Sequence, residues 1–226
     1  MIPPQPSIEI LGIQLNEPVT TLTDLVVSAV CFYAFFKLSK LSDKTSLHQY
    51  LKYYFLSMGM ATAIGGLIGH GFFYLFSFYW KLPGWWTSMV AINLIERAVI
   101  EYARNYIKPK TARFFAILNI VELITFMVLT FSTLNFLFVE IHTTYGLLLF
   151  VASFSTYIYI KTKSKGSKFF LIAVLLAAIS ALFFMNEWSL HMWFNYLDIS
   201  HTLMAISAFL FYKGAREIMT ETKKEL

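Results

Sequence analysis

The sequence predicts an all-α polytopic membrane protein, a bundle of seven transmembrane helices with its N-terminus outside and its C-terminus inside. Three observations support this fold class: an apolar composition, seven apolar segments of span length, and basic residues confined to alternate loops. Hydrophobic residues make up 58% and charged residues 14% of the 226 residues, whereas about a quarter of an ordinary soluble domain is charged. The composition therefore excludes an ordinary soluble fold.

Each apolar segment has close to the ~20 residues that a helix needs to cross a hydrocarbon layer ~30 Å thick. The predicted spans are residues 20–38, 53–76, 85–106, 112–134, 137–160, 169–185 and 196–212. None of them alternates apolar and polar residues as a strand would. We expect three regions: a short extracytoplasmic segment at 1–19, the bundle at 20–212 and a basic cytoplasmic tail at 213–226.

The basic residues determine the predicted orientation. Sixteen of the 18 lysines and arginines fall, four at a time, near the loops after the first, third and fifth spans and in the tail. They are Lys37, Lys40, Lys44, Lys52, Arg104, Lys108, Lys110, Arg113, Lys161, Lys163, Lys165, Lys168, Lys213, Arg216, Lys223 and Lys224. Only Lys81 falls on the other side, and Arg97 lies inside a span. Because cytoplasmic loops are enriched in lysine and arginine, the basic side is predicted to be cytoplasmic.

The net charge of +5 follows from this topology and favours contact with an anionic inner leaflet. Membrane lipids are the expected partners, a nucleic-acid partner is not expected, and the sequence does not indicate an oligomeric state. The compact chain with short loops suggests a multi-pass protein of the plasma membrane, in a bacterium the inner membrane.

Three local features carry smaller predictions. Cys31 is the only cysteine, so no intramolecular disulfide is expected, and its place in mid-span indicates a buried small hydrophobe. Residues 7–16 alternate around Leu11-Gly12, as in a β-hairpin. Gly65 and Gly69 form a Gly-x-x-x-Gly pair that favours close helix packing, the alternative being that the glycines clear space around His70.

Four ionisable side chains share the outer layer of the predicted bundle. At 1.5 Å per residue, Asp24, His70, Asp198 and His201 all lie near the outer ends of their spans. Groups of this kind at membrane depth usually face the bundle interior and mark functional sites. Two imidazoles and two carboxylates suit zinc, either as four ligands or as three with a position left for water.

We expect His70, Asp198 and His201 to be the metal ligands, and Asp24 or Glu17 to act as general base or to orient a ligand. Two other interpretations stay open. The four groups could form a polar structural network, in which Asp198 caps the last helix, or a ligand site without metal.

A second cluster lies deeper, where Glu96, Arg97 and Glu101 of the third span approach Glu122 of the fourth. An unpaired guanidinium would be very costly in a span core, so Arg97 should pair with Glu101 or Glu122 and lock the two spans together. A proton or ion relay is the alternative, because Glu96 remains after pairing.

The segment Glu-Pro-Val-Thr-Thr-Leu-Thr-Asp at 17–24, Gly-His-Gly at 69–71 and Asp-Ile-Ser-His at 198–201 resemble an uncharacterised family of bacterial seven-helix membrane proteins. That resemblance covers nearly the whole chain and implies no known activity. More distantly, the layout is similar to the seven-helix superfamily of alkaline ceramidases and adiponectin and progestin receptors. Its members hold zinc with histidines of the second and seventh helices, which implies that His70 and His201 are ligands.

The chain departs from the superfamily pattern at several positions. The departures are Gly66 in place of a serine, Asn93 and Glu96 where the third helix has an aspartate, and Leu197 and Ala205 where a second histidine would flank His201. Asp198 would then replace the missing histidine as a ligand. The resemblance implies metal-dependent hydrolysis of an amide or ester bond in a lipid.

Three functions therefore remain open. The first is a metal-dependent membrane hydrolase with zinc as its cofactor. The second is a receptor or sensor that binds a lipidic or small-molecule ligand without chemistry. The third is a proton-coupled transporter that uses Glu96, Glu101 and Glu122, although no internal repeat is visible.

Overall fold

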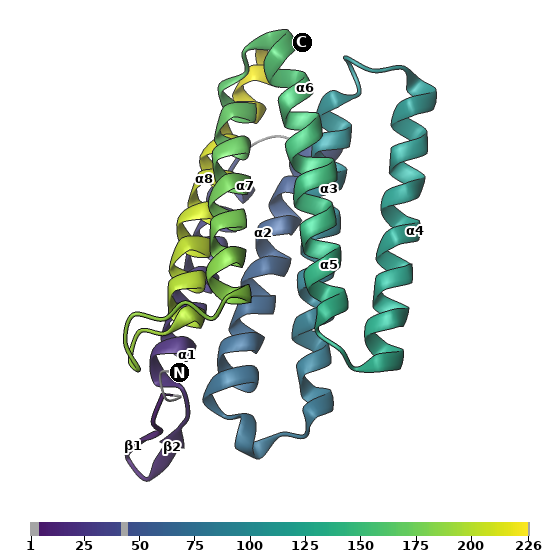
Figure 1. Cartoon of the computed structure of the whole chain (residues 1–226). Helices are drawn as coiled ribbons and strands as arrows, with labels where there is room; N and C mark the ends of the chain where they lie inside the picture. Colours follow the sequence, from purple (N-terminus) through teal and green to yellow (C-terminus); the bar gives the residue numbers. More distant parts are fainter. Residues whose placement is uncertain (1–4, 42–44, 226) are drawn as a thin grey trace.

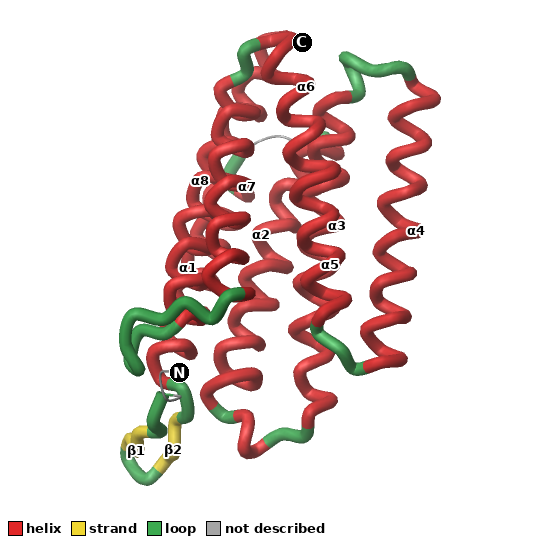
Figure 2. The backbone as a smooth tube through the Cα atoms, viewed as in Figure 1, coloured by secondary structure: helices red, strands yellow, loops and turns green. Residues whose placement is uncertain are grey.

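A computed structural model of the chain (Figure 1) describes residues 5–41 and 45–225, with side chains as far as residue 222. Lys44, Lys223 and Lys224, three of the basic residues used to predict the orientation, lie outside the described residues or side chains. Within the described residues seven long helices run side by side in one bundle, and the all-α prediction is confirmed. A short hairpin lies at one end, near the N-terminus, and the C-terminus lies at the opposite end (Figure 2).

Two of the seven long helices contain a π-helical segment, which divides them into separately labelled elements. The helices are α1 Pro18–Ser39, α2 Ser46–Ile64 continuing as η1 Gly65–Gly71, α3 Leu82–Ala103, α4 Pro109–Thr133, α5 Leu137–Tyr145 continuing through η4 Gly146–Ala152 into α6 Ser153–Thr162, α7 Lys165–Met185 and α8 Tyr196–Glu225. Two short 3-10 turns, η2 Phe73–Leu75 and η3 Phe78–Lys81, connect η1 to α3.

Four of these helices are long and apolar enough to cross a membrane: α1, α4, the continuous helix α5–η4–α6, and α7. The remaining helices carry more polar side chains. In α3 these include Glu96, Arg97 and Glu101, whereas α8 runs on for 30 residues into a charged end. Polar residues are tolerated in a span when they face the protein rather than lipid. Each of the seven predicted segments overlaps one long helix.

Apolar side chains cover the outer surface of the bundle. The edge helix α4 (Figure 1) has only four buried residues and exposes a series of large apolar side chains. These are Phe114, Ile117, Ile120, Val121, Ile124, Val128 and Phe131. Such a surface is too extensive for a soluble monomer and is suited to lipid. In the interior, Cys31 is completely buried within the apolar core, as expected from the sequence.

The predicted hairpin is confirmed. β1 Ile8–Ile10 pairs antiparallel with β2 Ile13–Leu15, and the two turn residues Leu11 and Gly12 have φ values of 52° and 78°. Positive φ at both central residues is the requirement of a type I′ turn, whose twist matches that of the strands. The backbone N–H of Asn16 donates to the carbonyl of Gly71 at 2.9 Å, which fixes the hairpin to the end of η1.

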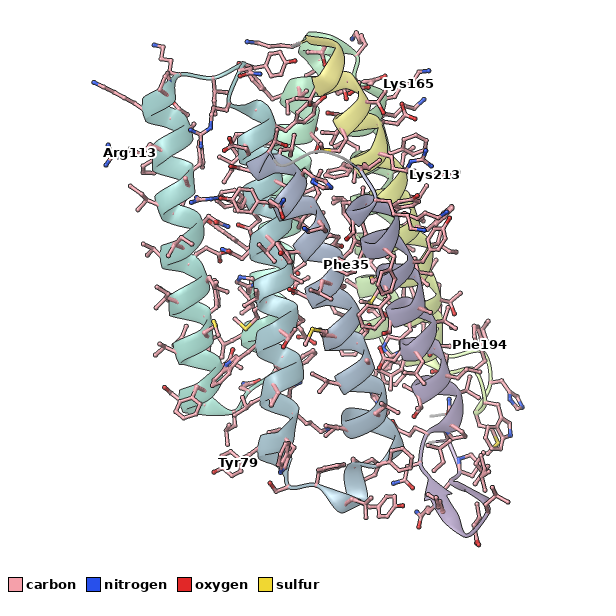
Figure 3. The ribbon with its side chains drawn as sticks, turned by 180° about the vertical axis from the view of Figure 1, so that it is seen from behind. Phe35, Tyr79, Arg113, Lys165, Phe194 and Lys213 are labelled. Atoms are coloured by element: carbon pink, nitrogen blue, oxygen red, sulfur yellow. The ribbon has the colours of Figure 1, made fainter. Side chains whose placement is uncertain are left out.

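The two ends of the bundle differ in their side chains. We call them the hairpin end and the C-terminal end. Arg113, Lys165 and Lys213 lie toward the C-terminal end, the upper end in Figure 3, whereas Tyr79 and Phe194 lie toward the hairpin end. The three labelled basic residues belong to segments that the sequence predicts to lie on one side of the membrane.

Candidate metal centre at the hairpin end

Three side chains from three helical segments converge at the hairpin end: Asp24 of α1, His70 of η1 and His201 of α8. One ligand atom from each lies within 4.8 Å of the other two. His201 Nε2 lies 3.6 Å from Asp24 Oδ1, and His70 Nε2 lies 3.9 Å from Asp24 Oδ2. The structure therefore brings together three of the four ionisable groups that the sequence places in one layer.

The orientation of His70 is fixed by Glu17. His70 Nδ1 lies 2.5 Å from Glu17 Oε2, and an ionised carboxylate accepts hydrogen bonds but does not donate them. Nδ1 therefore carries a proton, and in the neutral ring the lone pair of Nε2 lies on the side of Asp24, 3.9 Å from Oδ2. Glu17 occupies the position just before α1 with φ of 39°, a left-handed backbone that is uncommon outside glycine.

The orientation of His201 is fixed in the same way by Thr23. His201 Nδ1 lies 3.2 Å from Thr23 Oγ1, and this hydroxyl lies 3.0 Å from the carbonyl of Thr20. Because a carbonyl only accepts, Thr23 donates its single proton to Thr20 and accepts the proton of His201 Nδ1. The lone pair of His201 Nε2 then also points toward Asp24.

Two imidazole lone pairs and one carboxylate thus face one another, at distances too long for direct hydrogen bonds. A cation among them would remove the repulsion. Ligand atoms ~2.0 Å from a tetrahedral zinc ion lie about 3.3 Å apart, and one ligand atom from each of the three side chains lies within 4.8 Å of the other two. The donor set fits a divalent metal ion with three protein ligands and one open position.

Asp198 does not join this cluster. Its Oδ2 accepts from the backbone N–H of Asn195 at 2.7 Å, while Asn195 Oδ1 accepts from the N–H of Leu197 at 2.8 Å and of Asp198 at 3.4 Å. This reciprocal arrangement is a capping box at the start of α8. Thr20 Oγ1 and Gln5 Nε2 also donate to the Asp198 carboxylate, at 2.9 and 2.7 Å.

Asp198 therefore caps α8 and ties it to α1 and the N-terminal segment, as the alternative interpretation of the sequence proposed. Asp24, rather than Asp198, groups with His70 and His201. Glu17, the other predicted catalytic group, lies against His70, where it orients the ring.

The glycines of η1 allow α1 to come close to the cluster. A Cβ atom at Gly66 would lie 2.8 Å from Asp24 Cβ and 3.2 Å from the carbonyl of Thr21, whereas one at Gly69 would meet nothing within 4 Å. Of the predicted Gly65/Gly69 packing pair, only Gly65 faces α1, since a Cβ atom there would lie 3.5 Å from Asp24 Oδ2, and the closer approach occurs at Gly66. The space that this glycine provides is for Asp24 and its helix rather than for the imidazole of His70.

A family model matches the chain over residues 19–220: DUF6962, a family of unknown function. The chain belongs to this family. The match contains Asp24, His70 and His201, together with all seven long helices apart from their outermost residues. No match was found among curated proteins. Membership of DUF6962 brings no activity with it, and no comparison links the chain to the ceramidase and receptor superfamily.

The deeper cluster of this DUF6962 protein differs from the prediction. Arg97 Nη1 donates to the carbonyl of Ala116 at 2.6 Å, and Glu101 pairs with Arg104 at 2.6 Å. The expected pair of Arg97 with Glu101 or Glu122 is not among the ion pairs of the described residues. Arg97 lies one to two turns from the C-terminal end of α3, near enough for its long side chain to reach toward that end of the bundle.

Two asparagines join α3 to α4 where the arginine was expected to do so. Asn93 Nδ2 donates to the carbonyl of Asn119 at 2.8 Å, and Asn119 Nδ2 donates to the carbonyl of Asn93 at 3.2 Å. A second bond of Asn119 Nδ2 reaches Glu96 Oε2 at 2.9 Å. Polar side chains of this kind hold transmembrane helices together where lipid provides no hydrophobic driving force.

The sequence prediction missed His142 of α5, whose Nε2 lies 3.3 Å from Glu122 Oε1. His142 is completely buried. One signal was present: the predicted spans contain three histidines, and His142 lies five residues into its span, as His201 does. The count of residues along the spans did not indicate its contact with Glu122, because Glu122 lies farther from the outer end of the fourth predicted span.

Proposed function

We propose that this chain is a seven-span membrane protein whose Asp24, His70 and His201 bind a zinc ion and hydrolyse an amide or ester bond of a lipid. One observation carries the proposal. Both imidazoles are held at Nδ1 by a neighbouring acceptor, so that both Nε2 atoms are directed at the same carboxylate. Partners that fix the tautomer of a ligating histidine in this way are typical of metal sites.

The membrane location rests on the four helices that are long and apolar enough to span it and on the lipid-facing surface of α4. The basic C-terminal end would face the cytoplasm and the hairpin end the outside. The plasma membrane is the location that fits this orientation.

The ligand count favours catalysis over a purely structural metal. Structural zinc sites use four protein ligands, whereas catalytic sites use three and keep one position open. Asp198 does not supply a fourth ligand, because its carboxylate caps α8 and accepts hydrogen bonds from Thr20 and Gln5. A zinc ion bound by Asp24, His70 and His201 would supply a Lewis acid and a source of hydroxide near neutral pH.

In the proposed reaction, water adds to the acyl carbon and the carbon–nitrogen or carbon–oxygen bond breaks. The leaving amine or alcohol takes a proton from the water. Glu17 acts as a positioning residue, because it holds the Nδ1 proton of His70. With 24% of its side chain exposed, against 8% for Asp24 and 12% for His201, His70 is the most accessible of the three.

A lipid substrate is favoured by the surroundings of the site. The segment between η1 and α3, which follows His70 in the chain, carries six exposed aromatic side chains: Phe73, Tyr74, Phe76, Phe78, Tyr79 and Trp80. Aromatic residues of this kind concentrate at the boundary between headgroups and acyl chains, which is where the ester and amide linkages of lipids lie. The metal site and the scissile bond would then lie at the same depth in the bilayer.

The test is hydrolysis of fluorescent lipid amides and esters in mixed micelles by the full-length protein, loaded with zinc. Hydrolysis is expected in the parent, lost on chelation and restored by zinc, and abolished in His70→Ala and His201→Ala. His191→Ala is the matched control, because this exposed histidine lies at the same end but outside the cluster. If the parent binds zinc yet cleaves neither class of bond, the hydrolase proposal fails and a ligand-binding receptor is favoured.

A further inference from the structure

A second group of metal-ligating side chains lies inside the bundle, where α3, α4 and α5 meet. It consists of Glu96, Glu122 and His142, and one ligand atom from each lies within 4.8 Å of the other two. Glu96 and His142 are 0% exposed and Glu122 is 7% exposed. No residue is shared with the hairpin-end site.

Five of the six side-chain polar atoms of this group lack hydrogen-bond partners among the described residues, the exception being Glu96 Oε2, which accepts from Asn119 Nδ2. Glu96 Oε1, both carboxylate oxygens of Glu122 and both ring nitrogens of His142 are buried without one, and so is Oδ1 of the adjacent Asn119. The 3.3 Å between His142 Nε2 and Glu122 Oε1 does not have hydrogen-bond geometry. Buried polar groups in proteins are nearly always paired, so this concentration of unpaired atoms points to a missing partner.

That partner should be a cation. Two carboxylates buried together repel each other and are costly to ionise unless positive charge lies between them. The arginine nearest in sequence does not provide it, because Arg97 Nη1 donates to the carbonyl of Ala116 and its guanidinium lies 6.0 Å from the ring of Tyr50.

We propose that Glu96, Glu122 and His142 bind a divalent transition-metal ion. Two carboxylates balance its two charges, and a neutral imidazole supplies a nitrogen ligand, so that the occupied site is electrically neutral within the membrane. Mixed imidazole and carboxylate ligands suit zinc, manganese and iron, whereas calcium takes six to eight oxygens, about twice what this group offers.

The backbone of the continuous helix α5–η4–α6 is shaped around the group. Gly146 begins the π-helix η4, four residues after His142 and therefore on the same face of the helix. A Cβ atom at Gly146 would collide with Glu96 Oε1 and with the side chain of Ile92. Single-turn π segments occur frequently at functional sites; here η1 carries His70, and η4 begins one turn after His142.

The ion would hold the edge helix α4 to the bundle. The buried residues of α4 are Ala112, Asn119, Glu122 and Thr130. Apolar contact alone gives little driving force for helix association in lipid, so α4 depends on these few inward polar contacts. A metal ion bound between Glu122, Glu96 and His142 would link α4 to α3 and α5.

The test uses the full-length His70→Ala/His201→Ala double variant in detergent, so that the hairpin-end site cannot contribute. We expect one zinc or manganese ion per chain after equilibration with the metal and gel filtration, and a higher unfolding temperature with metal than without it. Adding Glu122→Gln or His142→Gln should remove both effects. Glu101→Gln is the matched control, because Glu101 lies on α3 but pairs with Arg104, and it should leave them unchanged.

Two results would overturn the proposal: a double variant that binds less than about a tenth of an ion per chain, or variants at Glu122 and His142 that bind metal as the double variant does. If those variants fail to fold, cobalt(II) replaces zinc in the double variant. Visible absorption bands of bound cobalt that change on adding Glu96→Gln support the site, and an identical spectrum contradicts it. Since the hairpin-end site is disabled throughout, its own success or failure does not affect the result.

Discussion

His201 Nδ1 and Thr23 Oγ1 lie 3.2 Å apart, and the hydroxyl proton of Thr23 is directed at the carbonyl of Thr20. This relationship selects one tautomer of His201 and directs Nε2 toward Asp24. Glu17 does the same for His70 from the other side of the cluster. The candidate metal centre therefore depends on two supporting residues as well as on its three ligands.

Thr23→Val should weaken zinc binding about 10- to 100-fold, because Nδ1 of His201 loses the acceptor that fixes its tautomer. Thr23→Ser keeps the hydroxyl and should restore binding to within a few-fold of the parent. Competition with a chromophoric chelator measures both. Equal affinity in the parent and Thr23→Val would show that the hydroxyl does not orient the ring.

Glu17→Gln should lower zinc affinity by roughly tenfold or more, since a neutral amide polarises the His70 imidazole less than a carboxylate does. Glu9→Gln, an exposed position in the hairpin, provides the comparison and should bind as the parent does. Isothermal titration of the detergent-solubilised protein with zinc distinguishes the two variants. The account of Glu17 fails if both variants bind zinc equally well.

Gly66→Ala should destabilise the protein by about 1–3 kcal/mol, the usual cost of overpacking, because the added methyl group would lie 2.8 Å from Asp24 Cβ. Gly69→Ala adds the same methyl group where nothing lies within 4 Å. Alanine is also the better helix former, so this control should be neutral or slightly stabilising. Thermal unfolding followed by circular dichroism measures the difference, and equal losses in both variants would contradict the assigned contact.

Asp198→Asn should lower the free energy of unfolding by about 1–3 kcal/mol, because it weakens the three buried hydrogen bonds that the charged Asp198 carboxylate accepts. The metal content should stay at the parent level, because Asp198 lies outside the ligand set. Elemental analysis and thermal unfolding on the same preparation separate the two roles. Loss of metal with an unchanged unfolding temperature would make Asp198 a ligand after all.

Cysteine labelling should reveal the orientation, since the native Cys31 is completely buried. Leu11, 98% exposed at the hairpin turn, and Lys163, exposed between α6 and α7, are suitable positions for single cysteines. A membrane-impermeant maleimide should label Leu11→Cys in intact cells and Lys163→Cys only after permeabilisation. The reverse pattern would invert the proposed topology.

The helices could be predicted from the sequence because their length is set by the membrane and their apolar runs are uninterrupted. Their ends could not. α2 begins at Ser46, seven residues before the predicted span, because Thr45 caps it by accepting the N–H of His48. The same long helix ends at Gly71, where η1 gives way to 3-10 turns. Hydropathy alone carries no information on such local hydrogen bonds.

The layer that contains Asp24, His70 and His201 could also be predicted, because depth follows from counting residues along a helix. The role of each carboxylate could not, because it depends on rotation about the helix axis and on neighbours distant in sequence. The Asp198 carboxylate accepts hydrogen bonds from Asn195, Thr20 and Gln5. Thr20 and Gln5 are distant from Asp198 in the sequence, and only the fold brings them close to it. The two π segments change helix rotation in a way that a count of 3.6 residues per turn does not include.

The central claim is that Asp24, His70 and His201 bind a metal ion, and metal content of the purified protein tests it most directly. The full-length parent, His70→Ala and His201→Ala are purified in detergent without chelator, equilibrated with zinc and counted by elemental analysis. We predict that each variant holds one zinc ion per chain fewer than the parent, while His191→Ala holds as many. Equal zinc in all four proteins, or none in the parent, would contradict the account.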